Sequence, residues 1–280
     1  MGLNPFGKPS AAPDGRGAPV TMGSLWLAVA FAVFMWWFAT GLVLMLDSLP
    51  RTSFRWSLLL SSLLTIAALA ALHRTSQQTS LANVYCAFTC ALLIWGWHEL
   101  TFLTGAITGP RRHALPANVT GWPRFVASVQ AILWHELAIL AMGVSIVAMT
   151  WDAPNQVGTT TFLVLWVMRI SAKLNLFFGV RNLSEEFLPK HLAYMASFFR
   201  KRRMNALLPF SVVGGGIVAG MFITAAGADT AVPAAAVGSA LVATLLVLAI
   251  IEHLLLVVPI PATVLWKWAM RPAGPGAATP

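Results

Sequence analysis

The sequence from Pro233 to Val258 reads PAAAVGSALVATLLVLAIIEHLLLVV, and no charged side chain occurs in it before Glu252. A helix needs about 20 consecutive, predominantly apolar residues to cross the hydrocarbon core of a bilayer. This stretch meets that length and therefore predicts a transmembrane helix. It also contains Glu252 and His253 near its end, so it raises the question of what ionisable groups do inside a membrane.

Other stretches of the chain have the same apolar character. The shortest of them runs from 57 to 73, and none shows the period-2 alternation of a membrane β-barrel. With the opening stretch they predict an all-α fold, a polytopic transmembrane helix bundle of about seven spans. The predicted spans are 24–46, 57–73, 80–105, 125–151, 157–179, 205–226 and 233–258.

Composition supports a membrane protein and excludes a soluble enzyme. Hydrophobic residues make up 58% of the chain and charged residues only 10%, and the mean hydropathy is +0.76. A soluble domain carries roughly 25% charged residues. The net charge of +9 would suggest nucleic acid in a soluble protein, but no basic module with interleaved aromatic residues occurs. We therefore expect no nucleic-acid partner. Cys86 and Cys90 lie in one apolar run and are interpreted as small core residues.

The ends of the chain differ from its apolar middle. Residues 1–22 are rich in Gly, Pro and Ala, which predicts a disordered N-terminal tail, and we expect the same of 271–280. The apolar run after the first tail is too long for a signal-peptide core and lacks a clear cleavage site, so we interpret it as a retained first helix. The transmembrane domain is predicted to span 23–270.

The basic residues predict the orientation of the bundle. Most of the 18 Lys and Arg residues lie in connections on one side, whereas only Lys8, Arg16 and Arg74 lie on the other. The positive-inside rule then places the N-terminus in the periplasm and the C-terminus in the cytoplasm. The longest connection, 180–204, is amphipathic and ends in a basic run. It is either a helix on the membrane surface or an ordinary basic loop; a docking surface for a partner is a weaker alternative.

Eight ionisable residues fall inside the predicted spans. A charge at mid-bilayer costs about 2.5–3.5 kcal/mol on the mildest scale, so these residues must pair, bind a ligand or reach water. All eight are predicted to lie one to three turns from the cytoplasmic end of their spans, which favours one shared site. They are His98, Glu99, His135, Glu136, Arg169, Lys173, Glu252 and His253.

Three interpretations of this polar layer stay open. Three histidines and three glutamates suit a metal such as iron, manganese or zinc, although each His is adjacent to its Glu, unlike the Glu-x-x-His spacing of di-iron bundles. The layer could instead be a structural ion network, because Arg169 and Lys173 share a helix face and can neutralise two glutamates. The last alternative is an organic ligand such as a tetrapyrrole, with Trp95 and Trp134 at the same depth.

The residues of the layer carry a resemblance to a known family. The chain resembles the PuhE family, whose members are named as photosynthetic complex assembly proteins of purple phototrophic bacteria. The similarity runs from about Leu25 to Trp268. The strings that carry it are Trp95-Gly-Trp-His-Glu-Leu100, Thr108-Gly-Pro-Arg111, Trp134-His-Glu-Leu137, Arg169-Ile-Ser-Ala-Lys-Leu-Asn175 and Glu252-His253.

The resemblance implies a function. The PuhE family is encoded alongside the reaction-centre H subunit, which implies assembly of the reaction centre and core antenna or regulation of bacteriochlorophyll supply, in the inner or intracytoplasmic photosynthetic membrane. The implied partners are subunits of those complexes, membrane lipids and bacteriochlorophyll. No catalytic residues carry over, so we expect a non-enzymatic role. The alternatives are a di-iron-type membrane oxidoreductase acting on a tetrapyrrole or other lipid-soluble substrate, and a small proton-coupled transporter.

Overall fold

The structure is a computed structural model that describes residues 21–183, 185–229, 231–258, 260 and 262–269. Nearly all of the expected N-terminal tail and all of the expected C-terminal tail lie outside the described residues.

The described residues form a bundle of seven α-helices, and each is long and apolar enough to cross a membrane. Within the described residues there is no β-strand, only an isolated bridge between Val180 and Lys201. The prediction of an all-α bundle of seven spans is thus confirmed. The helices are α1 (Met22–Asp47), α2 (Phe54–Ser76), α3 (Leu81–Leu103), α4 (Gly121–Met149), α5 (Val157–Phe178), α6 (Leu207–Ala226) and α7 (Pro233–Leu255); the short 3₁₀-helices are η1 (Arg51–Ser53), η2 (Glu185–Phe187), η3 (Lys190–Phe198) and η4 (Ala262–Trp266).

Three asparagines in the connections join the end of one helix to another helix. Asn155 donates from its side chain to the Thr75 carbonyl at the end of α2 (3.0 Å). Asn205 donates to the Asn175 and Gly179 carbonyls at the end of α5 (3.1 and 3.0 Å), and Asn182 donates to the Leu255 carbonyl in α7 (2.8 Å). Terminal helix carbonyls have no intrahelical partner, and these amides supply one.

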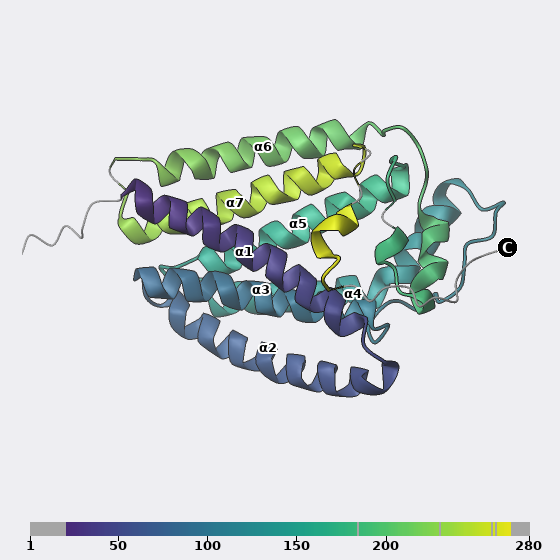
Figure 1. The fold of residues 1–280 in the computed structure, drawn as a ribbon, viewed down its shortest axis with the longest axis horizontal. Coiled ribbons are helices and arrows are strands. Elements are labelled where there is room, and N and C mark those ends of the chain that lie inside the picture. The colour runs from purple at the N-terminus through teal and green to yellow at the C-terminus, as the bar shows by residue number, and fades with distance from the viewer. Residues whose placement is uncertain (1–20, 184, 230, 259, 261, 270–280) are drawn as a thin grey trace, which may run out of the picture.

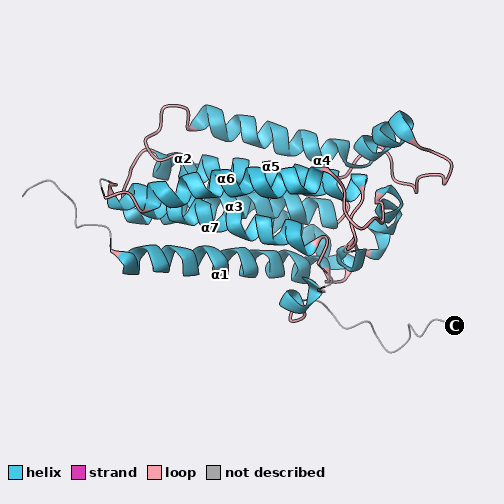
Figure 2. Ribbon diagram, turned by 90° about the horizontal axis from the view of Figure 1, so that it is seen from above, coloured by secondary structure: helices cyan, strands magenta, loops and turns pink. Residues whose placement is uncertain are grey.

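The helices alternate in direction, and α3 and α7 lie at the centre of the bundle (Figure 1). Figure 2 places α1 and α4 on opposite sides, with α3 and α7 between them. One core cluster joins α1, α3 and α7 through Ala32, Phe88 and Leu241. Another joins α3, α4 and α5 through residues that include Ile139 and Phe162. Small and aromatic residues therefore bring the helices together, as is typical of membrane bundles.

The connection between α5 and α6 is docked on the end of the bundle. Leu192 and Met195 of η3 are buried and pack with Phe102 and Leu103 at the end of α3. Arg124 at the start of α4 is also buried. Its guanidinium donates to two carbonyls, that of Phe177 in α5 at 3.0 Å and that of Phe198 at the end of η3 at 2.5 Å. In the sequence, Arg124 is only one of the basic residues that predict the orientation of the bundle. In the structure it also holds η3 against α4 and α5. Whether this segment also touches lipid stays a prediction.

Candidate functional site

Helix α5 carries polar residues at alternate positions, Arg169, Ser171, Lys173 and Asn175. Successive helical residues are about 100° apart. Arg169 and Lys173 therefore share one face, about 40° apart, and Ser171 and Asn175 share the opposite face. This spacing allows α5 to form polar contacts with helices on two sides.

The cationic face of α5 pairs with glutamates of two helices. Arg169 Nη2 donates to Glu99 Oε2 of α3 at 2.7 Å, and Lys173 Nζ donates to Glu136 Oε1 of α4 at 2.5 Å. The Arg169 side chain keeps 42% of its surface exposed and Glu99 only 15%, so this pair lies at the side of the bundle. The pairing of these charges across three spans supports the prediction that they share one level.

The hydroxyl and amide face of α5 contacts α6 and α7. Ser171 Oγ lies 2.9 Å from His253 Nε2 and 2.8 Å from Ser211 Oγ. Asn175 Nδ2 donates to the same Ser211 hydroxyl at 3.2 Å. His253 Nδ1 is 2.8 Å from the Ala249 carbonyl, which can only accept. In neutral His253 the proton is therefore on Nδ1, and Nε2 is an acceptor that faces the Ser171 hydroxyl, whose single proton can go either to Nε2 or to Ser211 Oγ.

Glu252 differs from the other two glutamates. Its Oε1 accepts a hydrogen bond from Trp36 Nε1 of α1 at 3.0 Å, and no ion pair involving Glu252 forms within the described part of the chain. The Trp36 ring packs edge-on against Trp266, with ring centroids 5.3 Å apart. The Glu252 residue is exposed, and its carboxylate connects α7 to α1 through this bond.

In each adjacent His/Glu pair the two side chains take the same two roles. The histidines are buried, with exposures of 0% for His98, 1% for His135 and 2% for His253. Their neighbouring glutamates each bond to another helix. Since adjacent residues point about 100° apart, a His/Glu dipeptide puts an imidazole inside the bundle and a carboxylate between helices.

His98 and His135 form the least satisfied part of the layer. Among the described residues, neither ring nitrogen of His98 has a hydrogen-bond partner, and neither does Nδ1 of His135. The two ring centroids are 6.4 Å apart, and the surroundings are aromatic: Phe102 lies 4.6 Å from His135, and Trp97 lies 4.9 Å from His98. Burying an unsatisfied polar group costs about 1–3 kcal/mol. This pair is thus the centre of the candidate site.

The backbone after α3 holds His135 in place. The His135 N–H donates to the Thr108 carbonyl at 2.9 Å, and the Arg111 N–H donates to the Gln130 carbonyl at 3.3 Å. A Cβ at Gly109 would lie 2.0 Å from that same Gln130 oxygen, so only glycine permits this approach to α4. Two of the strings that resemble the PuhE family, Thr108-Gly-Pro-Arg111 and Trp134-His-Glu-Leu137, therefore meet in space. Sequence reasoning did not foresee this contact.

The six proposed metal ligands do not form one shell. Among the residues that the structure describes, no three His, Cys, Asp or Glu side chains are grouped so that they could hold a metal ion. Glu99 and Glu136 are instead engaged by cations. The geometry thus gives the metal interpretation no support and favours an ion network with a histidine pair inside it.

The two tryptophans predicted beside the layer lie in different surroundings. Trp95 packs edge-on against Phe162, with centroids 5.7 Å apart, and Trp134 is exposed on the outside of α4. A ligand contact by either stays a prediction. Trp36, which donates to Glu252, and Trp97, which packs edge-on against His98, both reach the layer. Trp36, Ser171, Asn175 and Ser211 were absent from the predicted site. All four are uncharged, so hydropathy alone did not mark them.

The chain is similar in sequence to one protein family and to one curated protein. The family described as "Protein of unknown function (DUF3623)" matches residues 22–276. A curated relative from Rhodobacter capsulatus, named "Uncharacterized 30.4 kDa protein in puhA 5'region", is 35% identical over 253 residues, which cover 89% of this chain and 92% of the relative. No solved structure matches. The family match covers nearly the whole chain, so the protein belongs to the DUF3623 family, in agreement with the PuhE-type resemblance of its motifs.

Proposed function

We propose that the protein is an inner-membrane factor that assists assembly of the photosynthetic reaction centre and core antenna, or regulates the supply of bacteriochlorophyll to them. The polar layer centred on His98 and His135 is its working site. The partners in this proposal are subunits of those complexes and the pigment.

The setting of the relative supports this proposal. Its printed name places it in the puhA 5′ region of Rhodobacter capsulatus, and the PuhE family that the motifs resemble is encoded alongside the reaction-centre H subunit. Seven helices able to span a membrane would put the factor in the same bilayer as the complexes. We place its N-terminus in the periplasm. An alkaline phosphatase fusion that is active in the 180–204 connection would contradict this orientation.

The histidine pair is the observation that carries the proposal. A scaffold gains nothing from buried imidazoles without partners, because each such group costs free energy. Imidazole nitrogen is a ligand for the iron of haems and for the magnesium of chlorophylls, so the pair suits a tetrapyrrole. Phe102 and Trp97 pack around it, so these rings would have to move for a pigment to reach the imidazoles.

No observation favours the alternatives as strongly. A di-iron oxidoreductase needs free carboxylates, whereas Glu99 and Glu136 are paired with cations of α5. The pigment-related role needs only the imidazoles and a lipid-facing approach.

Substitution of the histidines by phenylalanine tests the proposal. His98→Phe and His135→Phe remove unsatisfied polar groups from aromatic surroundings, so we expect protein abundance in the membrane to stay near or above that of the wild type. We expect the near-infrared absorbance of reaction centre and core antenna to fall. Immunoblots and spectra of the same membranes measure both quantities.

The matched control is Phe88→Leu, in the apolar cluster of α1, α3 and α7. As a packing defect it should lower abundance and absorbance in proportion. If the histidine variants also lose absorbance only in proportion to abundance, the layer is a scaffold and the proposal is wrong.

A further inference from the structure

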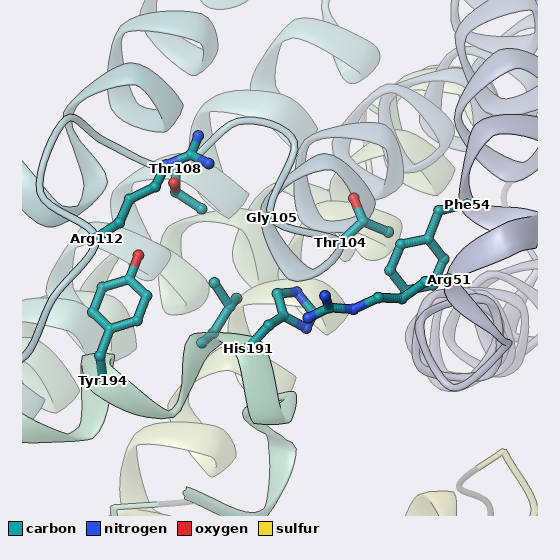
Figure 3. Close-up of a pocket in the computed structure, with 9 residues that line it drawn as sticks. Arg51, Phe54, Thr104, Gly105, Thr108, Arg112, His191 and Tyr194 are labelled. Carbon is teal, nitrogen blue, oxygen red and sulfur yellow. The ribbon is translucent and has the colours of Figure 1, made fainter.

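A pocket of about 330 Å³ opens at the end of the bundle where the basic connections lie. Three segments far apart in the sequence form it: η1 with the start of α2, the connection after α3, and η3 (Figure 3). It is separate from the polar layer, although Thr108 links the two, because its carbonyl accepts from His135 N–H. The lining residues are Arg51, Phe54, Thr104, Gly105, Thr108, Arg112, His191, Leu192 and Tyr194.

The lining of this pocket is cationic and has no acid. It contains two arginines and a histidine but no Asp or Glu, and no ion pair with Arg51 or Arg112 occurs among the described residues. Arg51 also borders a second, shallower hollow together with Thr52 and Arg55. Within the described residues, the two arginines of the pocket lining are therefore not paired with an acid.

Two buried hydroxyl groups in the pocket lack partners. Thr108 Oγ1 and the Tyr194 hydroxyl are buried atoms that form no hydrogen bond within the part of the chain that the structure describes, and the Thr108 residue is only 1% exposed. In Figure 3 the Tyr194 hydroxyl points toward Thr108 and Arg112, and the Arg51 side chain extends toward His191. These groups offer donors from several directions, and an unfilled buried donor costs free energy. A ligand that suits these groups is rich in acceptors.

The rest of the pocket is held by its backbone contacts. His191 Nε2 lies 2.8 Å from the Leu103 carbonyl, so this nitrogen donates to the end of α3. Gly105 has a positive φ of 77°, and a Cβ there would approach the His191 ring to 3.1 Å. The turn after α3 therefore requires glycine. It holds η3 beside Arg51 and Arg112 without the help of a ligand.

We propose that this pocket binds the phosphate group of an anionic membrane phospholipid. Guanidinium and hydroxyl donors without a neighbouring carboxylate match an oxyanion. A volume at the low end of the roughly 300–1,000 Å³ of ligand pockets suits a head group and not a large organic molecule.

The surroundings favour a lipid over free phosphate as the source. The pocket adjoins α2, whose Trp56, Leu60 and Leu63 are exposed and can line acyl chains. The Arg55 guanidinium lies 5.4 Å from the Trp56 ring centroid, a pairing suited to the head-group region. The charge distribution of the sequence also predicts that this end faces the anionic cytoplasmic leaflet.

Lipid titration of the purified full-length protein tests the proposal. Native mass spectrometry would compare phosphatidylglycerol, which is anionic, with phosphatidylcholine, whose phosphate is capped by a cation. We expect preferential retention of phosphatidylglycerol. Arg51→Gln and Arg112→Gln should each weaken its binding about tenfold, and Tyr194→Phe about fivefold, as expected for charged and neutral hydrogen bonds.

The control is Arg74→Gln, an exposed arginine at the opposite end of α2, which removes the same charge and should bind as the wild type does. Equal weakening by Arg74→Gln, or unchanged binding by both pocket arginine variants, would overturn the site. A separate arm measures thermal stabilisation by inorganic phosphate. If phosphate stabilises the wild type but not Arg51→Gln, and phosphatidylglycerol shows no preference, the lipid source is wrong. None of these outcomes depends on the pigment-related role proposed above.

Discussion

The two halves of the bundle are held together in different ways. In the half away from the basic connections, helices meet through small residues: a Cβ at Gly158 of α5 would lie 2.3 Å from Leu72 Cδ1 of α2, and one at Gly238 of α7 would lie 2.5 Å from Val157 of α5. In the other half, the same α5 pairs with Glu99 and Glu136. The first half sets how closely the helices approach, and the second sets which faces meet.

The difference matters because the lipid is as apolar as the helices. Helix association in a membrane depends on close packing and on polar contacts between helices. The apolar half gives tight packing without chemical selectivity. The polar half contains the unpartnered pair His98 and His135, which packing alone does not require. Stability should therefore respond to both halves, whereas function should respond to the polar half alone.

The largest expected effect comes from breaking one ion pair. Lys173→Met removes the cation and leaves the Glu136 carboxylate, 2.5 Å from Lys173 Nζ in the wild type, without a counter-charge. Removing one partner of a buried pair costs about 3–5 kcal/mol in soluble proteins. We expect a marked loss of folded protein, measured as abundance in membranes and as melting temperature in detergent.

A double variant separates charge from packing in this test. Lys173→Met with Glu136→Gln removes both charges, so most of the lost stability should return. If the double variant is as unstable as Lys173→Met alone, the side-chain packing of Lys173 matters more than its pairing with Glu136.

A smaller effect is expected from overpacking the apolar half. Gly158→Ala places a Cβ within 2.9 Å of the Ala87 carbonyl oxygen as well as against Leu72. Overpacking costs about 1–3 kcal/mol, so the melting temperature should fall, while absorbance per folded molecule should not change. Gly216→Ala in α6 is the control, because nothing lies within 4 Å of a Cβ there. A fall of equal size in Gly216→Ala would show that helix conformation, and not the α2 contact, sets the loss.

The helices and the level of the polar layer could be predicted from the sequence for a physical reason. The thickness of a bilayer sets the length of a span, so predicted spans such as 157–179 and 205–226 lie within two residues of α5 (Val157–Phe178) and α6 (Leu207–Ala226). Charges in lipid must find partners, and Arg169 and Lys173 do pair with glutamates at their level.

The partner of each group could not be predicted in the same way. That Lys173 selects Glu136, or that Ser171 contacts His253, depends on how each helix is rotated about its axis. The contact of Gly109 with α4 and the pocket around Arg51 and Tyr194 depend on the course of connections, which hydropathy does not describe.

The smallest expected effect concerns Trp36, which donates to Glu252 at 3.0 Å. Trp36→Phe keeps an aromatic ring beside Trp266 but removes the donor, and one hydrogen bond to a charged group contributes about 1.5–3 kcal/mol when fully buried. Glu252 is exposed, so we expect about 1 kcal/mol or less. Trp26→Phe is the matched control, because Trp26 lies on the same helix, is exposed and forms no hydrogen bond among the described residues. The difference between the two melting temperatures isolates the Trp36–Glu252 contact. Equal shifts in both variants would mean that this contact adds nothing to stability, and that α1 is held to α7 by apolar packing along its whole length.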